Sequence, residues 1–267
     1  MPPVAIVGNL SLDHVEGGPP RAGGAPFHAA RALRVLGRPA LVLVKCAPGD
    51  RHLLLPPLAA LGVPVAWIAG ASTAEFSFRY DGDHRLMTVD ALGDSWSAED
   101  VAGVGGARFV HVGPLARSDF PAATLAELAQ GRTVSYDGQG LVRPDRTGPL
   151  RLDGDFDPEV LRNVAILKLA EEEARVVLGV EPDETALRSL GVPEVVVTLG
   201  SRGALVLADG RFERVAARQL DGEIDPTGAG DAFAAAYLDS RATGHAPAAA
   251  ARQASALVAG LLARRLR

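Results

Sequence analysis

Short apolar runs alternate with longer amphipathic segments along almost the whole chain, and this alternation limits the possible folds more than any other feature. The first runs are Val4–Val7, Ala40–Val44 and Val63–Ile68. The segments Ala25–Leu36 and Leu53–Leu61 between them have helical spacing. Further strand-like runs are Arg108–Val112, Thr133–Tyr136, Val164–Leu169 and Glu194–Leu199. The alternation predicts a mainly parallel sheet with helices on both faces, in which ligands bind at the carboxyl ends of the strands.

One part of the sequence departs from this pattern. Polar and aromatic residues alternate over Glu75–Tyr80, an Asp-Gly-Asp turn follows, and Arg85–Val89 continues the strand-like pattern. Period-two alternation around an Asp-Gly turn predicts a β-hairpin. The hairpin is either an edge decoration or a lid over a substrate site, and the polar, Gly-rich stretch Leu10–Gly24 could face it. We therefore expect residues 1–267 to form one domain, with a small lid from parts of about residues 10–24 and 74–92.

Composition excludes several classes of protein. The 267 residues are 48% hydrophobic, which is enough for a large core, and the net charge of −5 provides no basic field for a nucleic acid. Cys46 is the sole cysteine, so neither an intramolecular disulfide nor a cysteine zinc cluster can form. The N-terminal residues do not have the pattern of a signal peptide, and no uninterrupted apolar stretch of about 18 residues predicts a membrane span. We expect a cytoplasmic protein with no nucleic-acid or membrane partner.

The strongest local motif is Asp225-Pro-Thr-Gly-Ala-Gly-Asp231, which leads into the apolar helical segment Ala232–Leu238. Small residues at a helix N-terminus let several backbone N–H groups converge on one point and form an anion site. A carboxylate at Asp231 could accept a hydroxyl proton while the anion site stabilises charge on a transferring phosphoryl group. The motif alone also allows a simpler explanation, in which Asp231 caps the helix and the glycines form a tight turn.

The same segment resembles the C-terminal signature of the PfkB (ribokinase-like) family of carbohydrate kinases, Asp-Thr-x-Gly-Ala-Gly-Asp. Gly23–Gly37 is similar to the glycine-pair motif of the family, and Ile166–Ala174 resembles the strand and helix start around its Asn-x-x-Glu motif. Val195–Ala204 resembles its nucleotide-side Thr-Leu-Gly-x-x-Gly hairpin. The matches run in family order along essentially the whole chain. The resemblance implies an α/β, ribokinase-like three-layer sandwich with a mainly parallel central sheet and a small β-lid.

The resemblance also implies an activity and a set of site residues. The chain would be an ATP-dependent kinase that uses Mg²⁺ and transfers the γ-phosphoryl group to a hydroxyl of a sugar or sugar-like molecule. Asp231 would be the general base, and the backbone of Gly228, Ala229 and Gly230 would form the anion hole. Glu173 would orient Mg²⁺-bound water. The residues expected to hold the substrate are Asp13, Gly23, Gly24, His28 and Gln139. Those expected to hold the nucleotide are Lys168, Thr198, Gly200, Gly203, Asp225 and Thr227. Lids pair in this family, so a homodimer through the lid is a further expectation.

Each assignment has a simpler alternative that the sequence leaves open. Asp13 could be a turn residue, the Thr198 segment an ordinary hairpin turn, and Glu173 one of three solvated glutamates in a first helical turn. His111 lies in an apolar run, which is typical of a core histidine. Arg143 could reach the substrate or the phosphates, as could Gln139.

Two departures from the family pattern leave the acceptor and the metal geometry open. His28 stands where the family has a sugar-contacting Asn, and Ala170 replaces the Asn of Asn-x-x-Glu. With the lid aromatics Phe76, Phe78 and Tyr80, these changes keep a nucleoside or inositol kinase as an alternative. A second alternative is a catalytically weak relative that binds a metabolite. A nicotinamide oxidoreductase and a P-loop kinase are disfavoured because neither glycine motif occurs.

Overall fold

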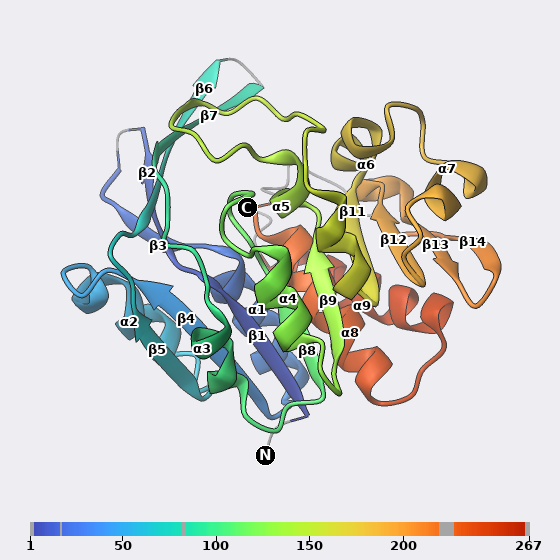
Figure 1. The fold of residues 1–267 in the computed structure, drawn as a ribbon, viewed down its shortest axis with the longest axis horizontal. Coiled ribbons are helices and arrows are strands. Elements are labelled where there is room, and N and C mark those ends of the chain that lie inside the picture. The colour runs from blue at the N-terminus through green and yellow to red at the C-terminus, as the bar shows by residue number, and fades with distance from the viewer. Residues whose placement is uncertain (1–2, 17, 82–83, 219–226, 265–267) are drawn as a thin grey trace.

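The computed structural model describes residues 3–264 except 17, 82–83 and 219–226. Within these residues the chain forms a nine-stranded sheet with helices on both faces and a separate five-stranded sheet (Figure 1). The expected three-layer α/β architecture with a second, smaller sheet is therefore confirmed.

The large sheet is parallel over most of its width. Its strands are β1 Val4–Asn9, β4 Ala40–Cys46, β5 Val65–Ala69, β8 Phe109–Val112, β9 Thr133–Asp137, β11 Ile166–Ala170, β12 Glu194–Thr198, β13 Ala204–Ala208 and β14 Arg211–Val215. They lie in the order β14-β13-β12-β11-β9-β8-β1-β4-β5, and β13 and β14 form the antiparallel edge. All six residues of β1 are buried, because helices cover both faces of the sheet. The carboxyl ends of the parallel strands therefore meet along one edge.

Helices form the two outer layers. One face is covered by α1 Ala25–Leu36, α2 Arg51–Ala59, α8 Ala229–Ala242 and α9 Pro247–Ala263. The other is covered by α3 Ala98–Val101, η1 Ala102–Val104, α4 Ala122–Leu128, α5 Gln139–Val142, η2 Pro158–Asn163, α6 Glu171–Leu178 and α7 Glu184–Ser189, while the short η3 Gly200–Arg202 joins β12 to β13. Among the described residues, no helix has both the length and the apolar character needed to cross a bilayer.

A glycine sets the C-terminal end of α1. Gly37 follows the helix in the left-handed conformation (φ 64°), and its N–H donates to the carbonyl of Arg34. The predicted limits Ala25–Leu36 are confirmed. The predicted helix Leu53–Leu61 lies two residues earlier, at Arg51–Ala59, where Leu54 and Leu58 are buried one turn apart on the core-facing side.

The smaller sheet is formed mainly by the two segments that were expected to make a lid. Its strands are β2 Ser11–Val15, β3 Arg21–Gly23, β6 Ala74–Asp81, β7 His84–Ala91 and β10 Gly148–Pro149, in the order β10-β7-β6-β2-β3. The hairpin predicted over residues 75–89 is confirmed as β6 and β7. The Gly-rich stretch before α1 forms two more strands of the same sheet (Figure 1). The sequence did not predict β10, because two residues of Gly-Pro have no strand periodicity.

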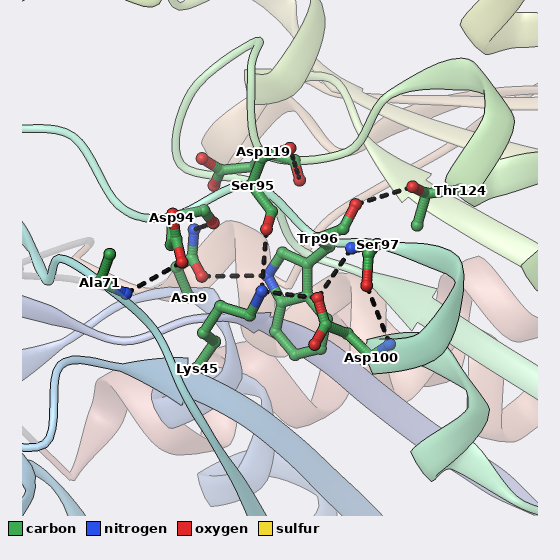
Figure 2. Close-up of polar contacts among 10 residues, drawn as sticks. All are labelled: Asn9, Lys45, Ala71, Asp94, Ser95, Trp96, Ser97, Asp100, Asp119 and Thr124. Atoms are coloured by element: carbon green, nitrogen blue, oxygen red, sulfur yellow. Dashed lines mark hydrogen bonds and ion pairs between the residues drawn. The ribbon is translucent and has the colours of Figure 1, made fainter.

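Buried polar contacts fix the return of the lid hairpin to the large sheet (Figure 2). Asn9, the last residue of β1, accepts a hydrogen bond from Trp96 Nε1 (2.9 Å) and donates one to the carbonyl of Asp94 (3.0 Å). Lys45 is 4% exposed, donates to the carbonyl of Ser95 (2.8 Å) and pairs with Asp100 Oδ2 at 2.6 Å. The segment that leaves the lid is thus tied to the carboxyl ends of β1 and β4.

Candidate active site

The motif Gly-Ala-Gly-Asp begins helix α8 as expected. Gly228 is its N-cap in the left-handed conformation (φ 75°), and Ala229, Gly230 and Asp231 form the first turn. N–H groups in a first helical turn have no partner within the helix, so they are free to meet an anion. A Cβ atom at position 228 would lie 2.3 Å from Nδ1 of His28, so both the backbone angle and the close contact require glycine.

Asp231 lies at the wall of a cavity of about 700 Å³ between the lid and the edge of the large sheet. Its carboxylate is partly buried, and Gln139 Nε2 donates to its Oδ1 at 3.5 Å. Gly228 lines the same cavity. The carboxylate and the start of the anion site therefore face one space, which is the geometry that proton removal and charge stabilisation need together.

The expected substrate residues gather around this cavity. Asp13 on β2, Gly24 at the N-cap of α1, and His28 on α1 all line it. Ser11 Oγ donates to Asp13 Oδ1 at 2.7 Å, which holds the carboxylate in place. Gly23 lines no described cavity, but a Cβ there would lie 2.2 Å from Asp13 Oδ2. Its contribution in the structure is to make room for the Asp13 side chain.

Lys168, which was expected to hold the nucleotide, is a buried residue beside the N-terminus of α8. It is 5% exposed, lines neither cavity, and pairs with the fully buried Asp137 at 3.1 Å. A Cβ at Gly230 would lie 2.9 Å from Lys168 Nζ, so the ammonium group lies directly behind the first turn of α8. Burial lowers the pKa of Lys168, but Asp137, Glu173 and Asp231 together raise it above its ordinary value. The group therefore remains a fixed positive charge.

The Asp137 carboxylate completes this buried pair. Burial would raise its pKa, but Lys168 holds it below the ordinary value. Asp137 also accepts a hydrogen bond from the backbone N–H of Gln139 (3.2 Å), which links the ion pair to α5. Asp137 was not among the residues expected at the site. Its position as an acidic residue at the end of a buried strand was the available signal.

Glu173 faces the first cavity although it is only 8% exposed. Its Oε2 accepts a hydrogen bond from the backbone N–H of Ala170 (2.6 Å), and burial raises the pKa of the carboxyl group. Ala170 lines the cavity without a polar side chain. No group of three His, Cys, Asp or Glu residues close enough to hold a metal directly occurs in the part of the chain that the structure describes.

A second cavity of about 290 Å³ lies on the other side of the α8 N-terminus. Thr198, Gly200 and Gly203 line it as expected for a nucleotide side, and Ala229 and Gly230 form its border with α8. Its remaining lining is Ser201, Ala217, Arg218, Phe233, Ser255, Val258, Ala259 and Leu262. The space is thus mostly apolar at one end and reaches the unpaired N–H groups of the helix at the other.

Four further residues were considered from the sequence, namely Asp225, Thr227, Arg143 and His111. Thr227 lines the first cavity instead of the second, and Asp225 lies outside the described residues. Arg143 lines the first cavity. His111 is fully buried with Nδ1 hydrogen-bonded to Ser135 Oγ (3.1 Å), and burial lowers its pKa. His111 is therefore a core histidine, as its apolar surroundings indicated.

Solved structures of similar fold include several kinases. One is a pyrophosphate-dependent kinase in the ribokinase family, solved with a pyrophosphate analogue and myo-inositol. It has 25% identity, a TM-score of 0.83, and coverage of 97% of this chain and 94% of its own. Another is the ribokinase of Arabidopsis thaliana complexed with ribose and ATP, at 21% identity, a TM-score of 0.76, and coverage of 98% and 92%. The fold and the site thus define a kinase of ribokinase-like architecture.

Sequence comparison gives the family. A model described as pfkB family carbohydrate kinase matches residues 11–265. The chain belongs to the PfkB family, and it is a phosphotransferase with an alcohol group as acceptor. A stretch of 89 residues is 39% identical to the cytidine kinase of Thermococcus kodakarensis. That match spans about a third of each protein, 32% of this chain and 32% of the relative.

Proposed function

We propose that this kinase transfers the γ-phosphoryl group of ATP to a hydroxyl of a polyhydroxylated small molecule, with Asp231 as the general base. One observation carries the proposal, namely that the first turn of α8 separates the two cavities. Gly228 and Asp231 line the larger cavity, while Ala229 and Gly230 line the smaller one. A donor in the smaller cavity and an acceptor in the larger would meet at the helix N-terminus.

The chemistry follows from that arrangement. Asp231 takes the proton of the acceptor hydroxyl, whose oxygen forms a bond to the γ-phosphorus as the bond from that phosphorus to the β–γ bridging oxygen breaks. ADP leaves with the bridging electron pair. The unpaired N–H groups of the α8 first turn stabilise the negative charge on the transferring group. Gln139, which donates to Asp231, keeps the carboxylate oriented.

Lys168 acts in this proposal as a positioning residue. Its ammonium group lies behind Gly230 and is fixed by Asp137, so it adds positive potential to the anion hole without contacting either cavity. A charge in a buried position is screened less than one at the surface. Ala170, which stands where the family has Asn, lines the larger cavity and offers no polar side chain there. Lys168 supplies a fixed positive charge next to the first turn of α8.

The residues present fit a magnesium ion held through water. Mg²⁺ keeps several waters and is usually bound by one or two carboxylates together with substrate phosphates. Glu172, Glu173 and Asp231 all line the larger cavity. Glu173 would orient a metal-bound water, and the ion would supply charge neutralisation for the phosphates.

The donor requires its own test, because the structural neighbour at 25% identity uses pyrophosphate. The smaller cavity favours a nucleotide. Phe233, Val258 and Leu262 offer an apolar surface that a purine ring could cover, and pyrophosphate alone would leave that surface empty.

A donor-by-acceptor assay tests the proposal. Phosphorylated product would be measured directly, with ATP or pyrophosphate as donor and with sugars, inositols and nucleosides as acceptors, each with and without Mg²⁺. We expect turnover with ATP and Mg²⁺. Turnover with pyrophosphate alone would overturn the choice of donor, and binding of acceptors with no turnover from either donor would favour a weak metabolite-binding relative.

A further inference from the structure

The larger cavity has two chemically different parts. Near Asp231 its wall is polar, with Asp13, His28 and Gln139 around the catalytic carboxylate. On and beside the lid it also carries apolar side chains, namely Phe76, Phe78, Met87, Leu115 and Leu150, next to the polar Ser77, Arg79 and Thr88. A ligand that fills the whole space must therefore combine a hydroxyl-bearing part with an apolar part.

Strand pairing in the lid fixes the arrangement of these two parts. Asp13 on β2 pairs directly with Phe76 on β6, so the Asp13 carboxylate, which is expected to bind the substrate, lies beside the Phe76 ring. Phe78 pairs with Met87 across β6 and β7, and the N–H of Leu150 donates to the carbonyl of Met87 (2.8 Å). Phe78 on β6, Met87 on β7 and Leu150, the residue that follows β10, therefore form one row, and this row lies two residues further along β6 than Phe76.

The row is too wide for a small polyol. Three strands span about 10 Å, and the step from Phe76 to Phe78 adds about 7 Å along the strand. Phe76 and Phe78 lie in one small apolar core with Leu115, and Met87 and Leu150 pack against it partly exposed. A sugar or inositol held by Asp13 would either leave the exposed parts of Met87 and Leu150 in water or place its own hydroxyls against them without partners.

Building on the proposed kinase function, we propose that the acceptor is a nucleoside. Its ribose lies between Asp13 and Asp231, and its base lies against the row formed by Phe78, Met87 and Leu150. A planar base has the shape and the apolar faces that this wall requires, and its ring can pack on the Phe78 side chain. The 39% identity of one segment to a cytidine kinase agrees with this choice.

Kinetics separate this proposal from the kinase function itself. With ATP and Mg²⁺ at saturation, kcat/KM would be measured for cytidine, uridine, adenosine, inosine, ribose, fructose and myo-inositol. We expect the best nucleoside to exceed ribose and myo-inositol by about 100-fold or more. Efficient turnover of a free sugar or of myo-inositol, equal to any nucleoside, would overturn the nucleoside assignment and leave the kinase standing. Absence of turnover on every acceptor would count against the kinase proposal.

Binding provides a readout that does not depend on turnover. Calorimetric titration of the Asp231→Asn protein with the same compounds is expected to show nucleosides binding at least about tenfold more tightly than ribose or myo-inositol. Equal or weaker binding of every nucleoside would overturn the assignment even if the enzyme were inactive for another reason.

A variant tests which residues form the wall. Phe78→Leu should raise KM for the best nucleoside about tenfold or more, with little change in kcat and in the kinetics of ribose. Leu53→Ala, at an exposed leucine of α2 away from both cavities, is the matched control and should change neither. Circular dichroism would confirm that both variants are folded. An unchanged KM for nucleosides in folded Phe78→Leu would contradict the proposed position of the base.

Discussion

Lys168 shows how one side chain can combine a structural and a functional role. It forms a buried ion pair with Asp137 while its ammonium group lies behind Gly230. Lys168→Met would leave the Asp137 carboxylate buried and unpaired, which should lower the free energy of unfolding by about 3–5 kcal/mol. Denaturant unfolding of Lys168→Met and of the double variant Lys168→Met/Asp137→Asn measures this, and the double variant should recover most of the loss.

The same pair of variants separates stability from catalysis. If the positive charge of Lys168 strengthens the anion hole, the folded double variant should have a kcat at least about tenfold lower than that of wild type. A double variant with wild-type kcat would show that Lys168 only fills and stabilises the core.

Gly228 is the second residue whose role can be isolated. Alanine at this position would strain a left-handed backbone (φ 75°) and bring a Cβ atom within 2.3 Å of His28 Nδ1. Gly244 has a similar backbone angle (φ 88°) with open space around it, so Gly244→Ala is a matched control for the strain alone. Both variants should lose about 1–2 kcal/mol of stability from the backbone. We expect Gly228→Ala alone to lose activity, by about 100-fold, and equal activity of the two variants would contradict the anion-hole assignment.

At the scale of secondary-structure elements, the connection between lid and core depends on buried groups near the end of β1. Asp119 accepts a hydrogen bond from the N–H of Leu115 (2.7 Å), a residue of the apolar cluster under the lid. The N–H of Trp96 donates to the carbonyl of Asp119 (2.8 Å). Burial raises the pKa of Asp119 to about 6 against the opposing effect of its backbone hydrogen bonds. This part of the lid support should therefore respond to pH.

The sign of that response follows from proton linkage. With a folded pKa of about 6 and an ordinary value of 3.8, the unfolded chain loses the Asp119 proton first as the pH rises. The contribution of Asp119 to stability is therefore full below pH 4 and falls between pH 4 and 6, by about 1.4 kcal/mol per pH unit at most. Asp119→Asn has no such proton to lose. Denaturant unfolding at pH 4, 5, 6 and 7 should show the variant gaining stability relative to wild type up to pH 6, and a difference independent of pH would contradict the prediction.

At the scale of the whole molecule, the alternation of apolar runs predicted the parallel part of the layered sheet, though not its antiparallel edge strands β13 and β14. Strands such as Val4–Asn9 are buried on both faces, so their sequences are continuous apolar runs that periodicity detects. The lid hairpin was predictable because β6 alternates polar and aromatic residues around a turn. The strand β10 was not, since Gly148 and Pro149 join the lid through long-range pairing with β7 and have no local signal.

The candidate site was predictable to a similar extent. The motif at Gly228–Asp231 indicated the helix N-terminus, and Asp13 and His28 lie on the same cavity as expected. Lys168 was expected to hold the nucleotide, and in the structure it is buried beneath the first turn of α8. Its ion pair with Asp137 on a neighbouring strand was not predicted, because pairing between strands is not visible in a linear sequence.

The proposed reaction depends on Asp231 as the base between two cavities, and a comparison of three proteins tests that role. Single-turnover phosphoryl transfer from ATP would be measured for wild type, Asp231→Asn and the exposed control Asp155→Asn, with the acceptor that wild type uses best. Asp231→Asn should bind ATP and acceptor as wild type does but transfer the phosphoryl group about 100- to 10,000-fold more slowly. Asp155→Asn should be unchanged. Transfer by folded Asp231→Asn at the wild-type rate would show that Asp231 is not the base.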